Sequence, residues 1–328
     1  MSAVNAHLCM LTRSFGRAWS QYINPHRVAG TQKLSTNMPG PNLAKIASDS
    51  LAAVASGHYT DAGGTTHLLE DLGKPQFASY TEYYPPDSAQ LSEWATAAPH
   101  QPSSQTQITL AKTSTLEGIR LLDGSARRGI LNFASATRPG GGFLGGARAQ
   151  EESLARSSNI YSSLMTPAGQ RFYRLHKSPA RKADKTYTHA MIFTKQVRFF
   201  RSDNGAWVEP ADADVLTSAA VNAGVVRSRF KDGDPDAEIE VHMRERMARL
   251  LRLFESKEIP DLVLGSFGTG VFRNSVPMVA RLWVELLLAP NARFAHSFKH
   301  IVFAIIDEKT WTVFRDVFRE YNIEFTER

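Results

Sequence analysis

Apolar residues recur along the chain in two spacings, one typical of helices and one typical of strands. From Leu43 to Val54 they recur every three or four residues, which places them on one face of a helix that Gly57 can end. Short apolar runs between turn residues predict strands, whereas longer amphipathic stretches predict helices. The predicted strands cover residues 108–110, 129–134, 191–193, 214–219, 262–264 and 301–306, and the further predicted helices cover 114–122, 154–164, 235–257, 276–288 and 310–321.

The alternation of these strands and helices predicts an α/β domain built in layers, because each element must bury its apolar face against another. Two segments show no sustained period. Residues 1–40 mix Ser, Thr, Asn, Gly and Pro, which predicts a flexible extension before a domain over residues 41–328. The stretch from Tyr80 to Gln107 is rich in proline and predicts an irregular surface segment.

The basic charge of the protein is concentrated at its N-terminus. The 328 residues carry a formal charge of +6, but residues 1–48 hold five basic and no acidic side chains, which leaves 33 basic and 32 acidic ones in the rest. The domain is therefore nearly neutral, and we expect no nucleic acid partner. An acid-free segment with Arg and Ser fits a mitochondrial targeting sequence as well as it fits an untargeted tail.

Composition favours a globular protein without a membrane span, disulfide or metal site. Hydrophobic residues make up 42% and charged residues 21%, as in soluble domains, and no apolar run approaches the roughly 20 residues that span a bilayer. Cys9 is the single cysteine, which excludes an internal disulfide, and the histidines show no HExxH spacing. We expect a monomer that needs no metal and no cofactor, in the cytoplasm or nucleus unless the extension targets it to mitochondria.

The densest glycine cluster follows the predicted strand 129–134 and ends in two acids. Such glycines let backbone N–H groups approach a ligand without Cβ obstruction, which suits an anionic diphosphate. Two acids would repel a phosphate unless one of them acts on a neighbouring sugar, although acids are also common in the first turn of a helix. Loop and acid pair together favour phosphate binding with acid–base chemistry beside it. The cluster contains Gly140, Gly141, Gly142, Gly145 and Gly146, and it is followed by Gln150, Glu151 and Glu152.

This segment resembles the signature of the microbial-type poly(ADP-ribose) glycohydrolases, in which three glycines are followed by a short spacer and then by Gln-Glu-Glu. A second segment, Gly265–Asn274, resembles the other phosphate-binding loop of that family and also follows an apolar strand. Phe272 in this segment matches an aromatic residue that, in the family, packs against the distal ribose. The resemblance extends more weakly from about Pro41 to the C-terminus. It implies a macrodomain-like three-layer α/β/α sandwich with additional N-terminal helices.

The resemblance also implies roles for individual residues. It assigns catalysis to Glu152, and it gives Glu151 the task of holding hydroxyls of the ribose under attack, with Gln150 in support. Ser135 and Asn222 match polar residues of the family, although a role in bonding the local backbone is at least as consistent with the sequence. The implied substrate-binding residues are Ser135, Gly140, Gly141, Gly142, Gln150, Gly268, Thr269, Gly270, Val271 and Phe272.

The function implied by the resemblance is hydrolysis of the ribose–ribose O-glycosidic bonds of poly(ADP-ribose), with release of ADP-ribose and with Glu152 as general acid and base. The implied partners are poly(ADP-ribose) or ADP-ribosylated proteins. Two alternatives stay open. One is a non-catalytic ADP-ribose reader, although a reader needs no acid at Glu152. The other is a hydrolase of mono-ADP-ribosylated targets, for which the same loops would serve.

Overall fold

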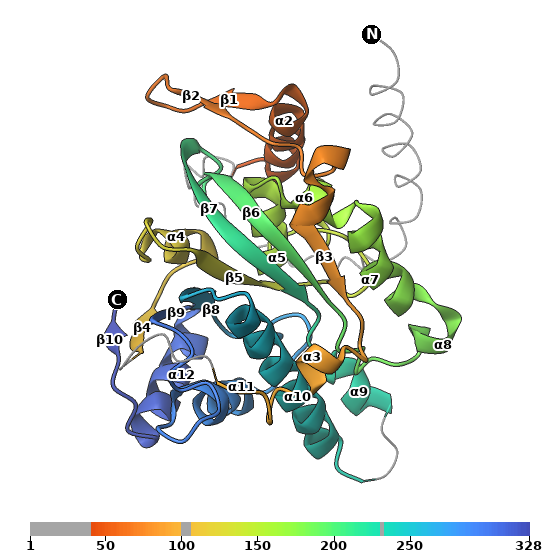
Figure 1. The fold of residues 1–328 in the computed structure, drawn as a ribbon, viewed down its shortest axis with the longest axis vertical. Helices are drawn as coiled ribbons and strands as arrows, with labels where there is room; N and C mark the ends of the chain where they lie inside the picture. The colour runs from red at the N-terminus through yellow and green to blue at the C-terminus, as the bar shows by residue number, and fades with distance from the viewer. Residues whose placement is uncertain (1–40, 100–105, 230–232) are drawn as a thin grey trace, which may run out of the picture. The chain divides into compact units, whose positions relative to one another are not determined.

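An eight-stranded sheet forms the centre of the part of the chain that the structure describes, residues 41–99, 106–229 and 233–328 of a computed structural model (Figure 1). The strand order is β10-β4-β9-β8-β5-β7-β6-β3, in which neighbours from β10 to β7 are parallel and the last two pairs are antiparallel. The strands are β3 (Thr81–Tyr84), β4 (Gln107–Ala111), β5 (Arg128–Phe133), β6 (Met191–Arg201), β7 (Trp207–Ser218), β8 (Asp261–Leu264), β9 (His300–Ala304) and β10 (Thr326–Glu327).

Helices cover both faces of this sheet, as Figure 1 shows, because successive strand residues are apolar on opposite faces. On β5, Ile130 packs into the core of one face and Leu131 into the core of the other. Such burial on both sides is typical of parallel sheets. One face is covered by α2 (Leu43–Ser56), α4 (Thr115–Arg120), α5 (Gln150–Ser157), α6 (Ile160–Leu164) and α7 (Pro167–Lys177), and the other by α3 (Ala89–Ser92), α9 (Ala223–Arg229), α10 (Pro235–Ser256), α11 (Val276–Trp283) and α12 (Glu308–Glu320). The predicted three-layer α/β/α sandwich is confirmed.

Capping hydrogen bonds are present at the start of two of the predicted helices. Helix α2 follows Asn42, whose Oδ1 accepts a hydrogen bond from the backbone N–H of Lys45 at 3.1 Å, and it ends at Gly57 in the left-handed conformation, with φ of 81°. Helix α4 follows Ser114, whose Oγ accepts from the N–H of Glu117 at 3.1 Å. The helix predicted over 276–288 is present as α11, followed by a π-helical turn to Leu288.

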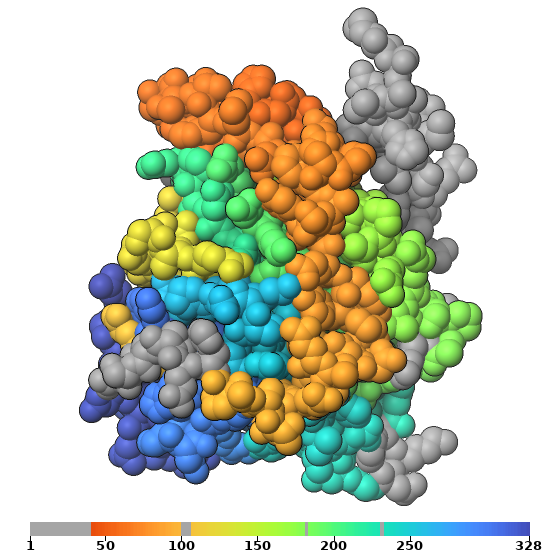
Figure 2. Space-filling view, viewed as in Figure 1, coloured from red at the N-terminus to blue at the C-terminus, as the bar shows by residue number. Residues whose placement is uncertain are grey.

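The prediction of an irregular segment from Tyr80 to Gln107 is wrong for part of its length. Residues Thr81–Tyr84 form β3, which pairs antiparallel with β6 at the edge of the sheet, and α3 follows. Its described part up to residue 99 is visible at the surface in orange in Figure 2. The strand is four residues long and ends before Pro85 and Pro86, so its own sequence signal is weak, and the pairing with β6 decides its structure.

Two further predictions are corrected by contacts with β6. The single helix predicted over 154–164 is broken into α5 and α6, because Ser158 bridges to Phe199 and Asn159 exchanges hydrogen bonds with the backbone of Arg198. Strands β6 and β7 are also much longer than predicted, since polar residues hide the pattern of this antiparallel hairpin. The elements that the pattern did not predict include β1 (His58–Thr60), β2 (Thr66–Leu68), α7, α8 (Pro179–Lys182), α9, β10 and the 3₁₀ helices Pro75–Tyr80 and Phe143–Gly145.

No helix within the described ranges has the length and apolar character needed to cross a membrane. The predicted extension over residues 1–40 lies outside the described residues. Its flexibility and its separation from the domain therefore stay predictions.

Candidate active site

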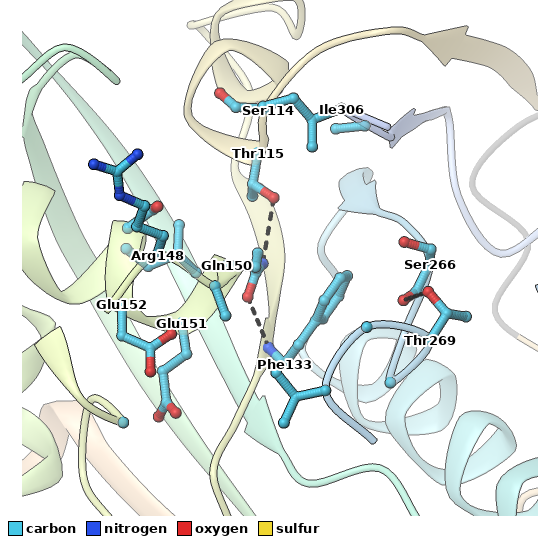
Figure 3. Close-up of a pocket in the computed structure, with 18 of the residues that line it drawn as sticks. Ser114, Thr115, Phe133, Arg148, Gln150, Glu151, Glu152, Ser266, Thr269 and Ile306 are labelled. Atoms are coloured by element: carbon cyan, nitrogen blue, oxygen red, sulfur yellow. Dashed lines mark hydrogen bonds between the residues drawn. The ribbon is translucent and has the colours of Figure 1, made fainter. Parts of the chain in front are cut away.

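A cleft of about 730 Å³ opens where the parallel neighbours β5 and β8 end. The glycine-rich segments after the two strands, residues 134–149 and 265–275, line this cleft together with the start of α5. Ligands of open α/β sheets bind in the crevice beyond the carboxyl ends of the strands. Figure 3 shows Glu151 and Glu152 on one side of the cleft and Ser266 and Thr269 on the other, with Gln150 and Phe133 between them.

Gln150 fixes the first turn of α5 against the end of β5. Its Oε1 accepts a hydrogen bond from the N–H of Phe133 at 2.9 Å, and its Nε2 donates to the carbonyl of Leu131 at 2.8 Å and to Oγ1 of Thr115 at 3.3 Å (Figure 3). The amide of Gln150 thereby forms hydrogen bonds with an N–H group and a carbonyl at the end of β5, which are the backbone groups that pair with a neighbouring strand in a sheet. Gln150 lines the cleft as predicted, but its amide bonds are made to the protein, so it supports the acid pair that follows it.

Glu151 is the buried member of the acid pair. The residue is only 3% exposed, and its Oε2 accepts a hydrogen bond from the N–H of Ser135 at 2.6 Å. Burial raises the pKa of Glu151 well above the usual range, and the charge of Glu152 raises it further, against the opposing effect of the hydrogen bonds to the carboxyl group. Burial of this carboxyl group therefore favours its neutral form over its charged form.

Glu152 lies beside Glu151 and is more exposed. Its Oε1 accepts a hydrogen bond from the N–H of Gly142 at 2.8 Å, which ties the carboxyl group to the glycine loop. Its Oε2 is buried and has no hydrogen-bond partner among the described residues. The Glu152 carboxyl group is thus held by one oxygen against the glycine loop, at the wall of the cleft.

Gly140 and Gly141 are needed by the packing of this loop itself. Both have positive φ, 66° and 59°. A Cβ on Gly140 would lie 2.9 Å from the ring of Phe143, and a Cβ on Gly141 would lie 2.8 Å from the carboxyl carbon of Glu152, with Oε1 closer still, and 3.1 Å from Oε2 of Glu151. The sequence prediction ascribed these glycines to space for a diphosphate. The structure shows that Gly141 makes space for the two carboxyl groups.

Gly270, in the second loop, borders open space. A Cβ on this residue would meet no atom within 4 Å. Within the described residues, the backbone N–H groups of Gly270, Val271 and Phe272 have no hydrogen-bond partner, and all three residues line the cleft. Successive backbone N–H groups without partners at the wall of a cleft are available to bind an anion.

The second loop is held in place from behind by several groups. The Nδ2 of Asn274, a buried side chain, donates to the carbonyls of Val221 at 2.8 Å and Gly268 at 2.9 Å. The ring of Phe272 packs against that of Tyr187, with centroids 5.8 Å apart. Tyr187 has a positive φ of 55°. Its carbonyl, in turn, accepts a hydrogen bond from the buried guanidinium of Arg246 at 3.2 Å.

Other predicted polar residues bond chiefly to the backbone. Oγ of Ser135 accepts from the N–H of Arg138 at 3.1 Å and so stabilises the turn before the glycines. Oδ1 of Asn222 accepts from the N–H of Val225 at 3.3 Å, at the start of α9, and Asn222 is not among the residues that line the cleft. Oγ1 of Thr269 donates to the carbonyl of Ser266 at 3.0 Å.

The structure brings all the predicted catalytic and substrate-binding residues except Gly140 to the wall of one cleft. It adds lining residues that the sequence did not indicate, because they come from distant elements. Asp203 comes from the turn between β6 and β7, and Ile306 and Asp307 follow β9. The further lining residues without a sequence signal include Ser114, Arg148 and Thr310. Among the described residues, no three His, Cys, Asp or Glu side chains are grouped so that they could hold a metal ion.

Comparison with known proteins gives consistent matches. The family model described as microbial-type PARG, catalytic domain, matches residues 47–202. The structure of poly(ADP-ribose) glycohydrolase from Thermomonospora curvata is similar to this chain, with 34% identity and a TM-score of 0.75, over 84% of this chain and 99% of that one. The same protein bound to the inhibitor ADP-HPD gives a TM-score of 0.73, at 34% identity over 84% of this chain and 98% of that one.

The poly(ADP-ribose) glycohydrolase from Deinococcus radiodurans in complex with ADP-ribose is 34% identical to this chain, with a TM-score of 0.66, over 75% of this chain and 98% of that one. No curated protein sequence shows a significant match.

Proposed function

Since this chain belongs to the microbial-type poly(ADP-ribose) glycohydrolase family, we propose that it hydrolyses the ribose–ribose O-glycosidic bonds of poly(ADP-ribose) and releases ADP-ribose. The observation that carries the proposal is the placement of an acid pair and an anion-binding loop in one cleft. The related proteins were solved with ADP-ribose and with ADP-HPD, which supports ADP-ribose as the ligand of this cleft.

In the proposed complex, the diphosphate of the terminal ADP-ribose unit accepts hydrogen bonds from the N–H groups of Gly270, Val271 and Phe272. These N–H groups need no rearrangement to bind the diphosphate, since they have no hydrogen-bond partner among the described residues. The distal ribose then lies towards Glu151 and Glu152. Glu151 holds hydroxyls of this ribose.

Glu152 performs the proton transfers. In the first step it donates a proton to the bridging oxygen, the bond from that oxygen to the anomeric carbon breaks, and the rest of the polymer leaves with a new hydroxyl group. The sugar becomes an oxocarbenium-like cation. In the second step the Glu152 carboxylate takes a proton from water, the water oxygen bonds to the anomeric carbon, and free ADP-ribose forms with Glu152 protonated again. The more exposed position of Glu152 supports this division of roles.

The direct test is incubation of the full chain with purified poly(ADP-ribose) and chromatographic detection of free ADP-ribose. We expect ADP-ribose to accumulate with enzyme concentration and time. Binding of ADP-ribose without any release from the polymer would contradict the proposal and favour a reader. Release from mono-ADP-ribosylated protein alone would contradict the substrate assignment.

A further inference from the structure

Two exposed arginines of the first glycine loop have no acidic partner. Within the described ranges, the side chains of Arg138 and Arg148 form no ion pair and no hydrogen bond, although both residues line the cleft. Some other exposed arginines of this protein do have an acidic partner, for example Arg127, which pairs with Asp214. Cationic groups at the wall of a cleft and without partners are available to an anionic ligand.

The backbone that carries these arginines is fixed next to the acid pair. The carbonyl of Arg138 accepts a hydrogen bond from the N–H of Gly141 at 2.9 Å, and Gly141 lies against both carboxyl groups. The carbonyl of Ala147, just before Arg148, accepts a hydrogen bond from the guanidinium of Arg156, whose residue is 6% exposed. Burial lowers the pKa of Arg156, the charge of Glu152 opposes this, and the charge of Arg148 lowers the pKa further.

Arg148 lies on the acid-pair side of the cleft, and Arg138 belongs to the same glycine loop and also lines the cleft. Figure 3 shows Arg148 on the side of Glu151 and Glu152, across the cleft from Ser266 and Thr269. If the proposed function holds, the terminal diphosphate lies at the second loop and the scissile bond lies at Glu152. The remaining chain then passes Glu152 and leads to the diphosphate of the next ADP-ribose unit.

We propose that Arg138 and Arg148 bind the diphosphate of the ADP-ribose unit on the leaving side of the scissile bond. Guanidinium groups bind phosphate oxygens through paired N–H donors, which suits this ligand. A mono-ADP-ribosylated protein has no second diphosphate at this position. The arginines therefore favour the polymer over mono-ADP-ribosylated targets. This inference rests on the proposed function for the position of the scissile bond.

The test measures binding, so that it does not depend on turnover. The affinities of labelled poly(ADP-ribose) and of ADP-ribose are measured in the Glu152→Gln variant, with and without the double change R138Q and R148Q. We expect the double change to weaken polymer binding roughly tenfold, since exposed charge pairs contribute modestly, and to leave ADP-ribose affinity unchanged. The salt dependence of polymer binding should also become flatter. R174Q is the matched control, because Arg174 is an exposed arginine of α7 that does not line the cleft.

Three results would overturn the inference. These are an unchanged polymer affinity, an equal loss of affinity for polymer and ADP-ribose, and an equal loss for a mono-ADP-ribosylated acidic peptide. Failure of the proposed function is visible separately, as absence of ADP-ribose release by the unaltered protein, while the ratio of the two affinities can still be measured.

Discussion

Replacement of Gly141 by alanine tests whether the carboxyl groups of Glu151 and Glu152 need the space that the missing side chain of this glycine leaves. The new Cβ would lie 2.8 Å from the carboxyl carbon of Glu152, so the carboxyl group must move and lose its hydrogen bond from Gly142. Loss of a hydrogen bond to a charged group costs about 1.5–3 kcal/mol, and the positive φ adds about 1–2 kcal/mol for a residue with a Cβ. We expect the free energy of unfolding to fall by about 2.5–5 kcal/mol. Hydrolysis should slow by about 100-fold, because the acid is misplaced.

Two matched glycine variants separate packing from ligand space. Gly270→Ala places a methyl group in the open cleft, so stability should change by less than about 0.5 kcal/mol while ADP-ribose affinity falls. A Cβ on Gly145 would also meet no atom within 4 Å, but Gly145 does not line the cleft. Gly145→Ala should therefore change neither stability nor ADP-ribose affinity. Denaturant unfolding, calorimetric titration with ADP-ribose and the rate of ADP-ribose release measure the three effects. Wild-type stability and rate in Gly141→Ala would refute the reasoning about the acid pair, and unchanged affinity in Gly270→Ala would refute that about the second loop.

Three further changes have defined outcomes. The raised pKa of Glu151 contributes stability that is fully present below the unfolded pKa of about 4.3 and is lost as pH rises through the folded pKa. The free energy of unfolding should therefore decline less between pH 5 and pH 8 in Glu151→Gln than in the unaltered protein. An identical decline in the two proteins would contradict the raised pKa. Gln150→Leu leaves backbone groups of β5 without partners and should lower the free energy of unfolding by about 2–3 kcal/mol; unchanged denaturant stability would argue against its supporting role. Tyr187→Ala should raise KM for the polymer, because the packing on Phe272 is lost, whereas Tyr187→Phe should not. Equal KM values in the two variants would show that the ring of Tyr187 does not position Phe272.

Several features of the site could be predicted from local sequence. The strand at 129–134 and the loop after it are marked by an apolar run followed by five glycines, and the strand at 262–264 and its loop are marked by an apolar run followed by three. Because both strands are parallel neighbours, their loops meet at one edge of the sheet. Gly57, which ends α2, likewise acts within a few residues of chain.

The features that could not be predicted depend on contacts between distant segments. Local sequence does not distinguish Gly141, which faces two carboxyl groups, from Gly270, which faces open space. Asp203 reaches the cleft through the β6–β7 turn, and that hairpin was predicted only in part. Burial of Glu151, in contrast to its neighbour Glu152, follows from how the first turn of α5 packs on β5, which no periodicity specifies.

The central claim is that Glu152 transfers the proton in the hydrolysis of poly(ADP-ribose). Glu152→Gln keeps the size of the side chain and an oxygen that can accept the hydrogen bond from Gly142, but it cannot donate and recover a proton. The decisive measurement is the rate of ADP-ribose release from polymer by this variant, together with its affinity for ADP-ribose. The account predicts near-normal affinity and a rate lower by roughly two or more orders of magnitude. Hydrolysis as fast as that of the unaltered protein would contradict it.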